Sequence, residues 1–249
     1  MSLIRVQTMN GVATVTLDDA ARRNVLSTGL VDELIAAFEK LEQDGEAAAV
    51  VLTGKGTAFC AGAVLDDLLA AVDGDAASVE RVYEGFDRVR RSPLLTIAAV
   101  NGPAVGAGFN LALACDIRIA ARSAWFDTRF LRIGLHPGGG HLRMLRQLVG
   151  PQTAAAMALC GERLGAEEAA LHGLVLRTVA DGELLDAARQ LAIRAAEAGR
   201  DLVTLTKRTL REAPDLSADA ALKTEGERQR WSFTRPETAA LLRNAVQKH

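Results

Sequence analysis

Residues 94–114 read LLTIAAVNGPAVGAGFNLALA, and this stretch decides the fold. Its first part, Leu94–Val100, is apolar except for Thr96 and is bounded by turn residues, which is typical of a strand buried on both faces. A glycine-bearing loop, Gly102–Gly108, follows directly, and Phe109–Ala114 then predicts a helix. The stretch therefore predicts a strand, a tight turn and a helix in immediate succession.

The same order occurs earlier in the chain. Val50–Leu52 belongs to an apolar run, Gly54–Gly62 forms a loop, and Val64–Val72 predicts a helix. A third strand, Asp116–Ala120, comes straight after the helix at 109–114. Buried strands that alternate with helices favour an α/β protein with a parallel sheet covered on both faces.

The flanking sequence completes this outline. Met1–Leu17 predicts a β-hairpin, because two β-type runs are separated by Asn10-Gly11, the preferred dipeptide for a tight hairpin turn. Apolar spacing from Leu30 to Leu41 predicts an amphipathic helix, and 47–53 a buried strand. The C-terminal third is predicted to be helical, with a strand or an extended link at Val175–Val179. The expected helices there cover residues 151–160, 166–172, 183–198, 201–212 and 217–231.

Composition excludes several classes of protein. The chain has 249 residues, 49% of them hydrophobic, and a net charge of −2, so it lacks the basic surface of a nucleic-acid or anionic-membrane binder. The three cysteines, Cys60, Cys115 and Cys160, fit neither a disulfide framework nor a thiolate metal site and favour a reducing cytoplasm. No secretory signal or apolar run of membrane-spanning length is evident.

The two glycine turns are the places where chemistry is expected. Each puts unpaired backbone N–H groups at a helix N-terminus, in Ala61-Gly62-Ala63 and in Gly106-Ala107-Gly108, where they can stabilise negative charge that develops on an oxygen. The alternative is that the glycines only make tight turns. Neither turn has the spacing of a dinucleotide or triphosphate motif.

Three blocks taken together resemble a known family. Residues 57–63 (TAFCAGA), 99–108 (AVNGPAVGAG) and 113–118 (LACDIR) are similar in sequence, order and spacing to the signature blocks of the enoyl-CoA hydratase/isomerase (crotonase) superfamily. The similarity continues through 133–140 (IGLHPGGG) and 148–150 (LVG).

The resemblance implies a ClpP/crotonase fold of repeated ββα units. Residues 1–190 would form this crotonase-like core, and 191–249 a C-terminal helical region for trimerisation or for a lid. The implied assembly is a homotrimer or a dimer of trimers.

The resemblance also implies the ligand and the residues that hold it. The ligand is an acyl-CoA thioester, with coenzyme A as part of the substrate and no other cofactor and no metal. The thioester oxygen would lie between the backbone N–H groups of Ala63 and Ala107. The implied coenzyme A contacts are Ala61, Gly62 and Gly106 from the main chain, and Arg22 and Arg23, whose alternative role is a solvated surface pair.

The chain departs from the family where hydratases carry two glutamates. Asn110 and Phe130 occupy these positions, and neither side chain can act as a general base near neutral pH. Two other residues are therefore candidates for proton transfer, His136 and Asp127. The alternatives are that His136 or His141 hydrogen-bonds a loop carbonyl or lies at a subunit contact, and that Asp127 caps or pairs with Arg129.

Three hypotheses follow. The first is an acyl-CoA-processing enzyme of the lyase or isomerase class with an unusual proton-transfer residue, for which standard hydration is not expected. The second is a non-catalytic protein that binds or delivers acyl-CoA. The third is a structural homo-oligomer without affinity for acyl-CoA.

Overall fold

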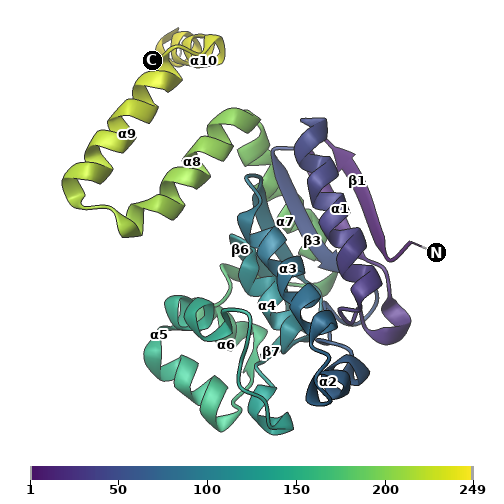
Figure 1. The fold of residues 1–249 in the computed structure, drawn as a ribbon. Helices are drawn as coiled ribbons and strands as arrows, with labels where there is room; N and C mark the ends of the chain where they lie inside the picture. Colours follow the sequence, from purple (N-terminus) through teal and green to yellow (C-terminus); the bar gives the residue numbers. More distant parts are fainter. Residues whose placement is uncertain (1, 248–249) are drawn as a thin grey trace.

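A computed structural model describes residues 2–247, and its centre is the expected parallel sheet (Figure 1). The strand order is β1-β2-β3-β4-β6-β9, in which only β1 runs antiparallel to its neighbour. The strands of this sheet are β1 (Ile4–Met9), β2 (Val12–Leu17), β3 (Ala49–Gly54), β4 (Leu95–Val100), β6 (Ile117–Ala121) and β9 (Arg177–Val179). The predicted hairpin is confirmed, and its turn residues Asn10 and Gly11 both have positive φ, as such a turn requires.

A second, smaller sheet lies where the sequence indicated only loops. It joins β5 (Ala104–Val105), β7 (Trp125–Asp127) and β8 (Leu164–Gly165), each two or three residues long. Such short strands form only when distant segments pair, so local periodicity does not reveal them.

Helices cover both faces of the main sheet, which is why its central strands β3 and β4 are almost entirely apolar. In β3, Val50 and Leu52 belong to the core shared with α1 (Thr28–Asp44) and α3 (Ala77–Arg91). The alternate residue Val51 belongs to a second core, formed with α7 (Leu184–Ala196). The mixed α/β architecture is thereby confirmed.

The remaining helices lie after the two glycine turns and along the C-terminal third. They are α2 (Leu65–Val72), α4 (Ala107–Ala114), α5 (His141–Cys160), α6 (Ala166–Leu171), α8 (Arg200–Glu212), α9 (Ala218–Phe233) and α10 (Pro236–Gln247), with short 3-10 turns η1 (Ala20–Arg22), η2 (Phe130–Ile133), η3 (Asp181–Glu183) and η4 (Ala213–Asp215). The predicted helical C-terminal third is confirmed, whereas α3 and α10 were not predicted. The α5 segment begins ten residues before the expected start at 151 and changes direction at Gly150, whose φ is 74°.

Helices α8, α9 and α10 extend away from the sheet in succession (Figure 1). Only α8 is fastened to the sheet by a buried cation: Lys207 forms an ion pair of 2.5 Å with Asp116 and donates a hydrogen bond to the carbonyl of Leu94. The expected division between residues 190 and 191 falls within α7.

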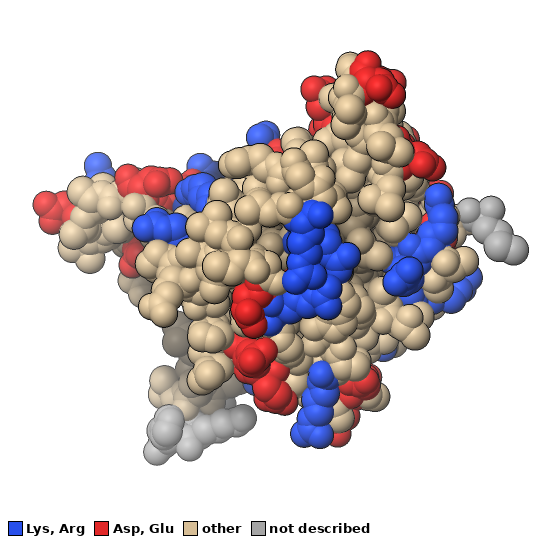
Figure 2. Space-filling view, turned by 90° about the horizontal axis from the view of Figure 1, so that it is seen from below, with Lys and Arg blue, Asp and Glu red and all other residues tan. Residues whose placement is uncertain are grey.

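The face of the molecule drawn in Figure 2 has no single dominant charge. On the face drawn in Figure 2, basic and acidic side chains form separate small groups with wide neutral areas between them. Among residues 2–247, no helix combines the length and the apolarity needed to cross a membrane.

The close packing of α4 against the first turn generates a prediction. A Cβ added to Gly108 would lie 2.2 Å from the carbonyl oxygen of Cys60, a backbone atom that cannot move aside. We expect Gly108→Ala to lower the free energy of unfolding by about 3 kcal/mol in urea denaturation. The matched control is Gly182→Ala, because a Cβ there has nothing within 4 Å, and it should change stability by no more than about 0.5 kcal/mol. Equal stability of the two variants would contradict this account of the packing.

Candidate active site

The two glycine turns lie side by side and are joined by backbone hydrogen bonds. The N–H of Cys60 donates to the carbonyl of Pro103 at 3.2 Å, and the N–H of Val105 donates to the carbonyl of Cys60 at 3.1 Å. Together they form a parallel bridge between Cys60 and Ala104. The second turn is fixed further by the N–H of Gly106, which donates to the carbonyl of Asp127 at 2.9 Å.

Two glycines give these turns their shape. Gly62 has a φ of 113° and Gly106 a φ of 52°, conformations that side chains disfavour. A Cβ on Gly62 would lie 3.0 Å from the carbonyl oxygen of Val105 and 4.0 Å from the nitrogen of Ala107, so the turns touch.

The backbone N–H groups that follow these glycines are unengaged. Within the described part of the chain, no protein acceptor receives a hydrogen bond from the N–H of Ala63 or of Ala107. Ala107 is the first residue of α4, so its N–H lies at the positive end of that helix. Both residues line a cavity of about 620 Å³. The arrangement can therefore donate two hydrogen bonds to one oxygen of a bound molecule.

The rest of the cavity wall is largely apolar. It is formed by α2, by α3 and by the segment from β7 to α5, with the side chains of Leu65, Leu68, Val72, Val79, Val82, Trp125, Phe130, Ile133 and Leu135. Its polar side chains are Arg23, Tyr83, Arg129 and His136. No aspartate or glutamate of the described residues lines it.

The two arginines of the η1 region have different surroundings. Arg23 lines the cavity, and its carbonyl accepts a hydrogen bond of 3.0 Å from the N–H of Ala61, which ties the arginine backbone to the first turn. Arg22 does not line the cavity and forms an ion pair of 2.7 Å with Asp19. Arg23 is thus the one of the two that can reach a ligand at the mouth of this cavity.

Asn110 does not line the cavity, and its side chain is hydrogen-bonded elsewhere. Its side chain is buried, its Nδ2 donates to the carbonyl of Gly138 at 3.0 Å, and its Oδ1 accepts a hydrogen bond from His141 Nδ1. Phe130, at the second departure, does line the cavity, and its ring packs edge-on against the His141 ring at 5.1 Å. Neither position supplies a carboxylate.

Asp127 is also buried and paired. Its Oδ1 accepts from the N–H of Arg129 at 2.8 Å, and its Oδ2 accepts from Arg129 Nε at 3.1 Å and from Arg163 Nε at 2.9 Å. It does not line the cavity. The sequence alternative of a pair with Arg129 is therefore what the structure shows, and this pair holds Arg129 in a left-handed conformation with a φ of 60° at the cavity wall.

His136 is the candidate that the structure places on the cavity. Its Nδ1 lies 2.9 Å from the carbonyl oxygen of Pro137. Because a carbonyl only accepts, Nδ1 carries the proton in this contact, which leaves Nε2 of the neutral ring with a free lone pair. A neutral imidazole of this tautomer can accept a proton.

His141 is a functional neighbour that the sequence named only as an alternative. It is fully buried between Phe109 and Phe130, and its Nε2 has no hydrogen-bond partner among the described residues. Burial lowers the pKa of His141 to about 4. The ring is neutral near pH 7 and serves to hold Asn110 and Phe130 in place. Its position directly after three glycines was the signal available in the sequence.

The buried thiol beneath the first turn is not a nucleophile. Burial raises the pKa of Cys60 to about 12, so its thiolate is scarce at neutral pH.

Comparison with known proteins places this geometry in context. Residues 7–238 match the family model described as "Enoyl-CoA hydratase/isomerase". The chain is 49% identical over 202 residues to "Probable enoyl-CoA hydratase echA14" of Mycobacterium tuberculosis, covering 80% of this chain and 78% of that one. It is 36% identical over 235 residues to 1,2-epoxyphenylacetyl-CoA isomerase of Escherichia coli, covering 92% and 90%. The crystal structure of an enoyl-CoA hydratase from Bacillus anthracis superposes with a TM-score of 0.92 at 29% identity, covering 99% of this chain and 97% of that one.

The buried imidazole of His141 predicts a pH-dependent stability. Its folded pKa of about 4 lies below the ordinary 6.5, so the unfolded chain binds a proton first as the pH falls. Stability from this group is complete above about pH 6.5 and is lost progressively toward pH 4, by about 3 kcal/mol in total. Urea unfolding of wild type and His141→Gln across this range measures it, and the variant should show a correspondingly weaker dependence on pH. The same slope in both proteins would contradict the assignment.

Proposed function

The chain belongs to the enoyl-CoA hydratase/isomerase family and is an enzyme of the lyase or isomerase class that processes acyl-CoA; from this premise we propose that it stabilises the thioester oxyanion with two backbone N–H groups and moves protons with His136. The observation that supports this most is the pair of unengaged N–H groups, Ala63 and Ala107, on two bridged turns at one cavity. Such donors are oriented before charge develops on the substrate, so the reaction requires little reorganisation of them.

In this proposal the thioester carbonyl lies between the two N–H groups. Removal of a proton from the carbon next to the carbonyl converts it to an enolate, whose negative oxygen both N–H groups stabilise. The helix α4 adds its positive end to the same point. A neutral His136 takes the proton on Nε2. If the acyl group is unsaturated, the proton returns to the far carbon of the dienolate and the double bond moves, which gives isomerisation. If the proton on Nε2 is first replaced by one from solvent and returned to the original carbon, the result is exchange.

Simple hydration is not supported by these side chains. With Phe130 on the cavity wall and Asn110 engaged by His141 and Gly138, neither position can activate a water molecule. A reaction that needs one proton carrier fits this cavity better than one that needs two carboxylates.

The remaining walls suit the two ends of an acyl-CoA. Aliphatic side chains of α2 and α3 offer apolar surface to the acyl group, and Arg23 offers a guanidinium to a phosphate of coenzyme A. Asp127 is a positioning residue here: it fixes Arg129 by ion pairing and the second turn through its carbonyl.

A second function, non-catalytic binding of acyl-CoA, is favoured by one observation, the lack of any acidic side chain among the described residues that line the cavity. The two functions differ in whether bound thioester exchanges protons with solvent. Deuterium incorporation into acyl-CoA in heavy water, followed by mass spectrometry, distinguishes them.

Removing one of the two N–H groups tests the oxyanion site. Proline is tolerated at the first residue of a helix, so Ala107→Pro should fold while lacking that donor. We expect turnover or exchange to fall about 10²- to 10³-fold, with the melting temperature and the affinity for free coenzyme A close to wild type. Ala107→Gly retains the N–H and should lose far less. Full activity of Ala107→Pro would refute this oxyanion site.

Replacing the imidazole tests the proton carrier. His136→Gln should lower the rate of deuterium incorporation about 10²- to 10⁴-fold, because the amide cannot accept a proton near pH 7. The matched control is His172→Gln, a surface position outside the cavity, which should exchange as wild type does. An unchanged rate in His136→Gln would exclude His136 as the carrier.

A further inference from the structure

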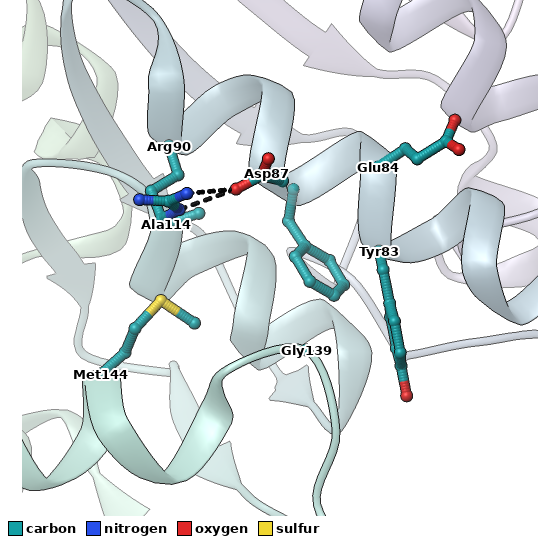
Figure 3. A pocket seen from close by; sticks show the side chains of 8 residues that line it. Tyr83, Glu84, Asp87, Arg90, Ala114, Gly139 and Met144 are labelled. Atoms are coloured by element: carbon teal, nitrogen blue, oxygen red, sulfur yellow. Dashed lines mark hydrogen bonds and ion pairs between the residues drawn. The ribbon is translucent and has the colours of Figure 1, made fainter.

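A second cavity of about 320 Å³ lies beside the first, between α3 and α5. Figure 3 shows Tyr83, Glu84, Asp87 and Arg90 on α3, with Met144 of α5 opposite them. Its buried lining is apolar and includes Phe86 and Ala114, each only 4% exposed. Its charged residues, including the Asp87–Arg90 ion pair, are more exposed and lie toward solvent.

Tyr83 is the one described residue that lines both cavities. Toward the first cavity its neighbours on α3 are Val79 and Val82, and toward the second it packs on Phe86, with the ring centroids 5.6 Å apart. The ring thus stands between two spaces whose buried walls are both apolar.

Two glycines hold this ring in place from the other side. A Cβ on Gly138 would lie 2.0 Å from the Tyr83 hydroxyl oxygen, and one on Gly139 would lie 2.4 Å from Phe86 Cζ. The backbone at Gly138 and Gly139 is therefore in direct contact with the edges of the Tyr83 and Phe86 rings. Asn110 fastens the turn by its hydrogen bond to the Gly138 carbonyl.

Packing contacts alone keep the Tyr83 side chain in position. No hydrogen bond joins its hydroxyl to a side chain or backbone group of the described residues, and the residue is 39% exposed, unlike the buried Phe86. Truncation of the Tyr83 side chain should therefore break no hydrogen bond within the described residues. The aromatic ring, rather than the hydroxyl, is the group that separates the first cavity from the second.

We propose that Tyr83 sets the acyl-chain length of the substrate, by ending the apolar cavity for straight aliphatic acyl groups and closing off the second cavity behind it. This proposal rests on the proposed function, since it assumes that the first cavity receives the acyl group. The substrate class is then an aliphatic acyl-CoA whose chain stops at the Tyr83 ring. Because Tyr83 is the described residue that the cavities of 620 and 320 Å³ share, we expect removal of its ring to join them.

The test is the affinity for saturated acyl-CoA of increasing chain length, measured by calorimetry on wild type, Tyr83→Ala and Tyr83→Phe. Each methylene that enters apolar space raises affinity about fourfold. In the wild type this rise should stop at the length that reaches Tyr83. In Tyr83→Ala it should continue over several more methylenes, so that the longest chains gain more than about tenfold. Tyr83→Phe retains the ring and should keep the wild-type limit.

Gly138→Ala supplies an independent test if Tyr83→Ala fails to fold. Its added methyl displaces the Tyr83 ring from the other side, so the length limit should also shift. The same limit in wild type and in whichever of Tyr83→Ala and Gly138→Ala folds overturns the proposal. Failure of all proteins, wild type included, to bind any acyl-CoA overturns the proposed function instead, so the two failures are distinguishable.

Discussion

The backbone bridge between Cys60 and Ala104 is the constraint on which the candidate site depends. Its two hydrogen bonds join turns that are more than 40 residues apart in the chain and belong to neighbouring parallel strands. Because both strands end at the same edge of the sheet, a single bridge suffices to bring the unengaged N–H groups of Ala63 and Ala107 to one cavity. Asn101 supports the same arrangement, because its side chain accepts a hydrogen bond from the N–H of Gly54 and donates to the carbonyl of Gly56.

The bridge brings two backbone segments so close together that glycines are required behind the cavity, at positions that do not line it. The carbonyl of Cys60 is in contact with Gly108 of α4, and the carbonyl of Thr57 with Gly102, at distances where a Cβ would overlap backbone. Cys60 is small and buried, and the raised pKa of its thiol makes it inert. At these two turns the groups available to a ligand are therefore backbone N–H groups, and the surrounding side chains only pack against them.

The residues considered for proton transfer have different surroundings in the structure. At the two departures from the hydratase pattern, Asn110 and Phe130 both contact the buried His141, so that region is a packed, neutral cluster. Asp127 is neutralised by two arginines. Of the sequence candidates only His136 remains on the cavity wall, which is why the proposed proton carrier lies in the loop before α5 rather than on α4.

The sequence by itself determined the parallel sheet, both glycine turns and the family, because apolar strands and positive-φ glycines are local requirements that residue types record directly. Through the resemblance it also predicts that Asn110 and Phe130 depart from the hydratase pattern, which stays a prediction. It did not determine the short strands β5, β7 and β8, the start of α5 at His141 or the partners of Asp127. Those depend on segments that meet only after folding. Whether a histidine or a carboxylate faces a cavity or a buried partner is decided by long-range packing, and that information resides in no single stretch of the chain.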